Sequence, residues 1–290
     1  MSGAVPREDL ARVPEAARAA AAPPPAVVRE RVAAGWRATP VWQNELGGLT
    51  YRLDPPAGPA GSGDGARSGA APAYLKWVPS PVAAVLDLAG EAARLRWAAG
   101  RARVPEVLGT GHDEDGDWLL TTALPGRSAV QPPWRDDPAR AAAGVGAGLR
   151  ALHEALDVRT CPWTWSAQDR AGRARARLEV EGTAAWAPEH AAIGADRVLA
   201  LLADPPPVEA VVCHGDACAP NTLLDDAGRP AGHVDLGHLG VADRWADLAV
   251  AAWSTEWNYG PGWGPTLLAA YGVRADPERE AFYRLLWDVT

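Results

Sequence analysis

The chain has few lysines and cysteines and no long apolar segment. Each of these features limits the classes of protein to which it can belong. Among 290 residues, no run approaches the roughly 18 to 20 apolar residues of a membrane-spanning helix. The cysteines, Cys161, Cys213 and Cys218, are odd in number and lack CxxC spacing, which indicates reduced thiols and a cytoplasmic protein. They have no partner histidines at ligand spacing, so we expect no zinc site. The net charge of −8 argues against nucleic acid as a partner and is compatible with a cationic small molecule.

Lys76 is the only lysine in the chain, and arginine supplies every other basic side chain. It stands in an apolar, strand-like run, YLKWV. Arginine is a wide planar fork and lysine a compact point charge, so they do not interchange where one ammonium must sit between phosphate oxygens. Glu91 follows in a stretch expected to be helical, 82–99, at the interval at which a strand lysine and a helix glutamate pair in a kinase small lobe. The alternative is a surface lysine kept by chance.

The most informative segment reads VVCHGDACAPNTLL and is followed by GHVDLG. Asp216 and Asn221 share one polar loop, and Asp235 stands on the next expected strand, so the three can converge from two directions. One carboxylate can orient an acceptor hydroxyl while the amide oxygen and the other carboxylate hold Mg²⁺. Kinase catalytic loops use the same Asp-to-Asn interval. The spacing therefore predicts phosphoryl transfer.

Apart from these motifs, the sequence predicts mostly strands in the first part of the chain and mostly helices in the second. A strand, Gly47-Gly48, and a second strand occupy 41–53, and further strands are expected at 104–108 and 118–122. Helices are expected at 139–156, 170–181, 193–203, 243–257 and 277–287. We expect a loosely held extension at 1–25, a nucleotide-binding lobe at 26–122, and a catalytic and acceptor-binding lobe at 123–290.

These features together resemble the aminoglycoside phosphotransferase family, and specifically its 3′-hydroxyl kinases. The similarity covers nearly the whole chain after the extension and is densest in HGDACAPN, VDLGHLGVADRWADLA, LHEALDVRTCPW and AFYRLLWD. It implies an α+β, protein-kinase-like fold of two lobes, with a small antiparallel sheet in the first and mostly helices in the second. It also implies ATP and Mg²⁺ as cofactors and a small-molecule acceptor.

The resemblance implies a role for each matching residue. Asp216 corresponds to the catalytic base, and Asn221 and Asp235 correspond to the magnesium ligands. The residues implied to bind the nucleotide are Lys76 on the phosphates, Glu91 as its ion-pair partner, Tyr74 stacked on adenine, Gly47 and Gly48 in the covering loop 46–50, and Thr122 to Leu124 at the hinge. His214 is expected to brace the catalytic loop, His153 to be a packing residue, and Asp243 and Asp247 to fix loop geometry or cap a helix.

The chain departs from the family pattern where the acceptor would bind. His238 follows DLG where the family usually has arginine, and the carboxylates expected to meet an acceptor's amines are reduced to Glu189, Glu256 and Asp288. Trp257 and Trp287 stand in the same segments. Indole rings suit stacking on a sugar face or cation–π contact with fewer amines.

The sequence therefore predicts an ATP-dependent O-phosphotransferase acting on a hydroxyl, expected to be the 3′-hydroxyl, of an aminoglycoside. A kinase of another amino sugar or small hydroxylated metabolite is the alternative that the missing acids favour. An inactive nucleotide-binding regulator is a third, against which the full set of Lys76, Asp216, Asn221 and Asp235 argues. Neither a nucleic acid nor a membrane is expected as a partner.

Overall fold

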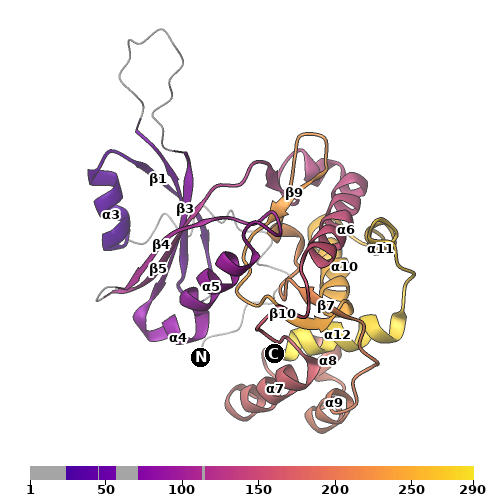
Figure 1. The fold of residues 1–290 in the computed structure, drawn as a ribbon. Helices are drawn as coiled ribbons and strands as arrows, with labels where there is room; N and C mark the ends of the chain where they lie inside the picture. The colour runs from indigo at the N-terminus through magenta and orange to yellow at the C-terminus, as the bar shows by residue number, and fades with distance from the viewer. Residues whose placement is uncertain (1–23, 45, 57–70, 113–114) are drawn as a thin grey trace. The chain divides into compact units, whose positions relative to one another are not determined.

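The computed structural model describes residues 24–44, 46–56, 71–112 and 115–290, which form two compact units (Figure 1). The small unit comprises described residues of 24–99 and 104–124, and the large unit comprises 100–103 and 125–290. The predicted boundary after residue 122 lies two residues before the division between Leu124 and Pro125. The extension expected at 1–25 lies outside the described residues up to position 23. Of the helices described, none combines the length and apolar character needed to cross a bilayer.

The small unit is built on a five-stranded antiparallel sheet with strand order β1-β2-β3-β5-β4. The strands are β1 (Arg37–Gln43), β2 (Leu49–Asp54), β3 (Ala73–Pro79), β4 (Val107–His112) and β5 (Gly116–Thr122). Alternate residues of β2 point to one face, so Leu49, Tyr51 and Leu53 are buried together. Helix α3 (Ala26–Ala33) adds Val27 and Val28 to this core. The strand expected at 104–108 begins later, at Val107, because Pro105 has no N–H for a ladder.

The single helix expected at 82–99 is instead two helices, preceded by the 3₁₀ turn η1 (Ser80–Val82). Helix α4 (Ala83–Leu86) ends at Asp87, and α5 (Leu88–Ala98) begins directly after it. Asp87 has φ of 23°, and its side chain accepts a hydrogen bond from the Gly90 N–H at 2.9 Å. A capping aspartate starts a helix well but interrupts one that is already running, so Glu91 belongs to the second helix.

The large unit is mostly helical, with two small sheets. Its helices are α6 (Pro138–Ala155), α7 (Ala167–Glu181), α8 (Pro188–Ala191), α9 (Ala195–Leu202), α10 (Trp245–Tyr259), α11 (Gly264–Tyr271) and α12 (Pro277–Val289), with 3₁₀ turns η2 (Trp134–Asp136) and η3 (Ala219–Asn221). One sheet has the order β6-β8-β9, formed by β6 (Arg127–Ser128), β8 (Thr222–Leu224) and β9 (Pro230–His233). The other pairs β7 (Ala210–Cys213) with β10 (Gly240–Asp243). The loop that follows β7 and the loop that follows β9 carry the predicted catalytic residues.

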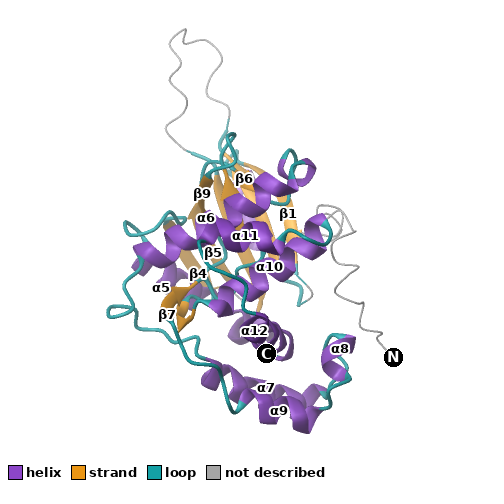
Figure 2. Ribbon diagram, turned by 90° about the vertical axis from the view of Figure 1, so that its right-hand side faces the viewer, coloured by secondary structure: helices purple, strands orange, loops and turns teal. Residues whose placement is uncertain are grey.

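Helices α6, α10 and α11 pack side by side in the large unit (Figure 2). Two of the three glycines in helix α6 lie where neighbouring atoms approach too closely for a side chain. A Cβ at Gly146 would lie 2.2 Å from the carbonyl oxygen of Leu267 in α11, and one at Gly144 would lie 2.7 Å from a methyl of Leu224. Helix α11 itself was not predicted, because its eight residues, GPTLLAAY, are almost uniformly apolar and show no helical period.

Asp235 does not lie on a strand, contrary to the prediction. Strand β9 ends at His233, and Asp235 has a left-handed backbone with φ of 65°. Such a conformation ends a ladder and is uncommon for residues other than glycine, although aspartate adopts it more readily than most. Backbone outliers of this kind are concentrated at functional sites.

Candidate active site

The predicted ion pair between Lys76 and Glu91 is present in the small unit. The Nζ atom lies 2.7 Å from Oε1 and 2.9 Å from Oε2, so one ammonium holds both carboxylate oxygens. The Glu91 side chain is only 6% exposed, whereas that of Lys76 keeps 26%. A buried carboxylate requires such a partner, and part of the lysine side chain is exposed to solvent. Strand alternation places Tyr74 on the same half-exposed face of β3, opposite the fully buried Leu75.

The turn between β1 and β2 is organised by Asn44, a residue that the sequence reading passed over. Its Oδ1 atom accepts hydrogen bonds from the backbone N–H of Leu46 at 3.0 Å and of Gly48 at 2.7 Å. Gly47 has φ of 87°, and a Cβ at Gly48 would lie 2.6 Å from the Asn44 amide nitrogen. The turn itself thus requires the two glycines. An asparagine shortly before a Gly-Gly pair is the sequence pattern that could have identified this turn.

The expected hinge residues follow β5 at the end of the small unit. The Thr122 hydroxyl accepts a hydrogen bond from the Glu106 N–H at 2.9 Å, and the Thr122 N–H donates to the Glu106 carbonyl at 2.9 Å. Thr122 is therefore tied to the segment that precedes β4. Leu124 is half-buried at the last position of the small unit.

His214 joins the two loops that carry the predicted catalytic residues of the large unit. The ring is fully buried. Its Nδ1 atom accepts from the Asp216 N–H at 3.3 Å, and its Nε2 atom lies 2.9 Å from the Val234 carbonyl oxygen. Because Nδ1 accepts, Nε2 must carry the proton and donate, which makes the ring a neutral bridge. The expectation that His214 braces the loop is confirmed.

Asp247, at the start of α10, anchors the backbone of the same loop. Its two oxygens accept from the N–H groups of His214 at 2.6 Å and Gly215 at 2.9 Å, and from the ring of His153 at 2.9 Å. Burial by itself would raise the pKa of Asp247, but the hydrogen bond and charge of His153 outweigh it and lower that pKa. Asp247 therefore fixes the loop as a buried anion, in agreement with the prediction.

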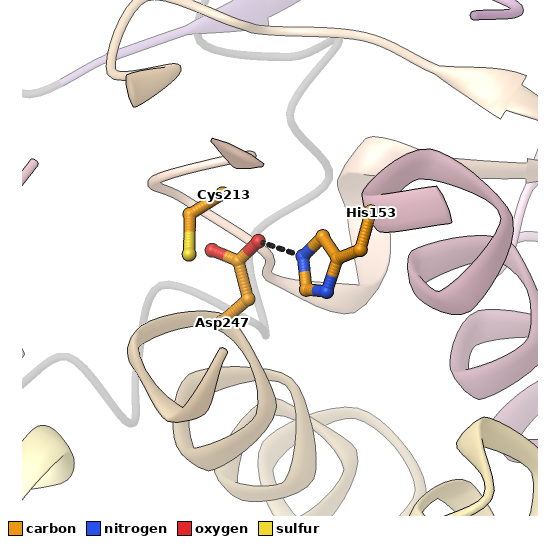
Figure 3. A group of neighbouring side chains, drawn as sticks. All are labelled: His153, Cys213 and Asp247. Carbon is orange, nitrogen blue, oxygen red and sulfur yellow. Dashed lines mark hydrogen bonds and ion pairs between the residues drawn. The ribbon is translucent and has the colours of Figure 1, made fainter. Parts of the chain in front are cut away.

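The side chains of His153, Cys213 and Asp247 lie together in the core (Figure 3). Their potential ligand atoms lie within 4.8 Å of one another. The Cys213 thiol, however, donates to the Asp243 carbonyl at 3.2 Å, and burial raises the pKa of this thiol well above its ordinary value. A protonated thiol and a carboxylate already accepting three hydrogen bonds make a hydrogen-bonded core cluster and a poor cation site.

Asn221 faces Asp216 with its amide nitrogen. The nitrogen donates to the Asp216 backbone carbonyl at 2.9 Å and to its Oδ2 atom at 3.2 Å. The amide oxygen is consequently directed to the other side. An amide oxygen with a carboxylate is the hard donor set that suits Mg²⁺, and Asp235 offers the exposed carboxylate.

Close backbone packing brings Asp235 beside the same loop. Gly215 has φ of 88°, and a Cβ there would lie 2.3 Å from the carbonyl oxygen of His238. The N–H of Val234, the residue before Asp235, donates to the Asn221 carbonyl at 3.0 Å. Desolvation lowers the pKa of the His238 ring, and the charges of Asp216 and Asp235 oppose that shift. The ring packs edge-on against Trp165, with centroids 4.5 Å apart. The loops that carry Asp216, Asn221 and Asp235 are therefore joined within the large unit.

Trp257 and Trp287 belong to an aromatic cluster with Trp253 on α10 and α12. Ring centroids are 4.7 Å apart for Trp253 and Trp257, 5.5 Å for Trp257 and Trp287, and 6.0 Å for Trp253 and Trp287. All three rings are partly exposed. Glu256, on the same face, pairs with Arg284 at 3.3 Å, and the Arg284 guanidinium lies over Trp253. The chain thus neutralises one of the predicted acceptor carboxylates internally.

Asp288 is placed differently from the expectation that it contacts acceptor amines. It is 1% exposed, and its Oδ2 atom accepts from the Ala187 N–H at 2.7 Å and lies 2.8 Å from His190 Nδ1. These bonds hold the segment that starts α8 against α12. Glu189, between the two held residues, remains exposed. The sequence could not reveal this arrangement, because the partners lie about a hundred residues apart.

Comparisons with known proteins show which family the chain is similar to. A family model described as the phosphotransferase enzyme family matches residues 64–283. An aminoglycoside 3′-phosphotransferase of Streptomyces fradiae is 41% identical over 231 residues, covering 73% of this chain and 84% of the relative. Among solved structures, an aminoglycoside-3′-phosphotransferase of type VIII has a TM-score of 0.70 at 30% identity, covering 90% and 98% of the two chains.

A second solved structure contains ligands. An aminoglycoside phosphotransferase from Streptomyces rimosus, in complex with ADP and streptomycin, has a TM-score of 0.66 at 26% identity. The alignment covers 91% of this chain and 96% of that one. The α+β, kinase-like fold predicted from the sequence is confirmed by these structures.

Proposed function

Because the chain belongs to the aminoglycoside phosphotransferase family, we propose that it transfers the γ-phosphoryl group of ATP to the 3′-hydroxyl of an aminoglycoside and releases ADP. The named 3′-phosphotransferases among its relatives support this acceptor and position. The single observation that carries the proposal is the bridge made by His214, which joins the Asp216 N–H to the carbonyl of Val234, the residue before Asp235, while Asn221 donates to the Asp216 carboxylate. Phosphoryl transfer depends on positioning and charge neutralisation, and this network supplies the positioning.

In the large unit, Asp216 would orient the acceptor hydroxyl and accept its proton as the bond to phosphorus forms. Asn221 would contribute its amide oxygen and Asp235 its carboxylate to Mg²⁺. The metal, when bound, would neutralise charge on the triphosphate oxygens. The hydrogen bonds from Asn221 to Asp216 couple the base to the metal ligand, so the two are positioned together.

In the small unit, Lys76 would bind the α- and β-phosphates while Glu91 keeps its ammonium in place. Tyr74, on the same face of β3, would stack on adenine. Gly47 and Gly48 would let the backbone of the β1–β2 turn approach the phosphates, and Thr122 to Leu124 would present backbone groups to the purine edge. The 2.7 Å ion pair is the feature that supports this assignment best.

The acceptor would be bound by the tryptophan cluster and by the carboxylates around it. Trp257 and Trp287 offer ring faces for a sugar, and Glu256 and Glu189 offer charge for ammonium groups. Asp288 would meet an amine only by giving up its bonds to Ala187 and His190. Since Arg284 already neutralises Glu256, acceptors with few ammonium groups fit this surface better than polyamines. That observation keeps a kinase of another amino sugar as a second candidate. A reduced, ATP-supplied cytoplasm suits Cys161, Cys213 and Cys218, which form no disulfide.

A panel of acceptors tests the proposal. ADP release would be measured with kanamycin, neomycin, glucosamine and homoserine, and with a 3′-deoxy analogue of the best aminoglycoside as the matched control. Turnover on the parent drug and none on its 3′-deoxy analogue is the expected result. Faster turnover on glucosamine would favour the amino-sugar alternative. Nucleotide binding without turnover on any acceptor would favour an inactive regulator.

A further inference from the structure

Cys218 donates a hydrogen bond from its thiol to the carboxylate that is proposed as the catalytic base. Its Sγ atom lies 3.2 Å from Oδ1 of Asp216. The other carboxylate oxygen, Oδ2, accepts from the Asn221 amide at 3.2 Å. Each carboxylate oxygen of Asp216 is thus held by a different side chain. The two contacts together oppose rotation of the carboxylate about its Cβ–Cγ bond.

Two donors matter because an aspartate carboxylate has no strong rotamer preference of its own. Its terminal torsion joins a tetrahedral carbon to a planar one, and such torsions are broad. A single donor leaves the carboxylate free to rock about that contact. Asn221 is, in addition, committed to presenting its amide oxygen away from Asp216.

The position of Cys218 is itself fixed by the fold. It is the residue that precedes η3, with an extended backbone (φ −60°, ψ 145°). The next residue, Ala219, is buried and donates its N–H to the Ser254 hydroxyl of α10 at 3.0 Å. The Asn221 N–H donates back to the Cys218 carbonyl at 2.9 Å. The peptide bond that joins Cys218 to Ala219 is therefore anchored at both its carbonyl and its N–H group.

We propose that Cys218 is a positioning residue for phosphoryl transfer, whose thiol fixes the plane of the Asp216 carboxylate. The inference rests on the proposed function through the role given to Asp216. A thiol suits this task because it is a weak donor and leaves the carboxylate basic. Each carboxylate oxygen has about two acceptor directions, so one direction per oxygen remains for the acceptor hydroxyl.

Kinetics of three variants test the donor role. Loss of one modest hydrogen bond corresponds to about a 5- to 10-fold change, so Cys218→Ala should lower kcat by about that factor with the KM for ATP unchanged. Cys218→Ser keeps an O–H donor and should recover most of kcat. Cys161→Ala is the matched control, because Cys161 is also half-buried and donates to a backbone carbonyl, that of Trp163, outside the catalytic loop. Equal losses in the Ser and Ala variants, with melting temperature and ADP affinity intact, would overturn the proposal, as would full activity of Cys218→Ala.

Thiol reactivity tests the contact without any turnover. In a Cys161→Ala background, Cys218 is the accessible thiol, since Cys213 is fully buried. A carboxylate next to a thiol opposes formation of the reactive thiolate, so Asp216→Asn should speed the reaction of Cys218 with 5,5′-dithiobis(2-nitrobenzoate) by about 10-fold or more. An unchanged rate would overturn the contact even if the kinase is active. If Asp216→Asn speeds the thiol reaction but the protein with Asp216 intact phosphorylates no acceptor, the proposed function is overturned. The contact between Cys218 and Asp216 is then still supported.

Discussion

The side-chain amide of Asn221 donates both to the backbone carbonyl and to the carboxylate of Asp216. Under the proposed function, Asn221 would therefore serve both the base and the metal. Asn221→Ala should therefore lower kcat and also raise the Mg²⁺ concentration needed for half-maximal rate. Asp216→Asn should lower kcat by about 10²- to 10⁴-fold, the range of general base catalysis, with the Mg²⁺ requirement unchanged. Rates measured across a Mg²⁺ titration check both, and a normal Mg²⁺ response in Asn221→Ala would remove it from the metal site.

The Lys76–Glu91 pair predicts a coupled effect on stability. Lys76→Met leaves a buried carboxylate without its partner and should lower the free energy of unfolding by about 1–3 kcal/mol. The double variant Lys76→Met with Glu91→Gln should recover part of that loss. Urea unfolding of both single variants and the double variant measures the coupling. Additive losses would contradict an energetic pair.

Lys76→Arg separates charge from shape. If the compact ammonium is what binds phosphate, the arginine variant should raise the KM for ATP almost as far as the methionine variant does. A near-normal KM for ATP in Lys76→Arg would show that any cation suffices there.

His233 predicts a loss of stability in mild acid. Burial lowers the pKa of His233 to about 3, below the ordinary value of 6.5, so the folded protein keeps this ring neutral. The unfolded chain takes up a proton as the pH falls below 6.5, and the folded chain does not until about pH 3. The contribution of His233 to the free energy of unfolding is therefore fully present above pH 6.5. It falls toward pH 3 by at most about 1.4 kcal/mol per pH unit.

Unfolding by urea at pH 7, 6, 5 and 4 measures this slope. His233→Gln should flatten it, and His112→Gln is the matched control because the His112 side chain is 70% exposed. An unchanged slope in His233→Gln would assign the acid sensitivity to other groups.

Trp287 tests the acceptor surface. Trp287→Ala removes one ring of the cluster with Trp253 and Trp257, and should raise the KM for the acceptor about 10-fold while that for ATP stays constant, as expected for a lost stacking contact of 1–1.5 kcal/mol. Trp42→Ala, at an exposed position of β1, is the control. Equal changes in both Michaelis constants would mean that the cluster only supports the fold.

The residues that could be predicted from sequence are those whose chemistry requires a fixed spacing. Asp216 and Asn221 share a loop, so a local motif shows them, and Lys76 stood out because arginine replaces lysine everywhere else. What was missed depends on contacts between distant segments. The partners of Asp288 lie 101 and 98 residues away, and Arg284 meets Glu256 across 28 residues. The break at Asp87 was missed because a capping aspartate within a helical period looks like any polar residue.

The tight seam between α6 and α11 has a consequence for anyone who engineers this enzyme. Replacing helical glycine by alanine usually gains up to about 1 kcal/mol of helix propensity. At Gly146 the added methyl would collide with the backbone of Leu267, so the exchange would separate the two helices. Gly172, in α7, has open space around it, and thermostabilisation should begin there.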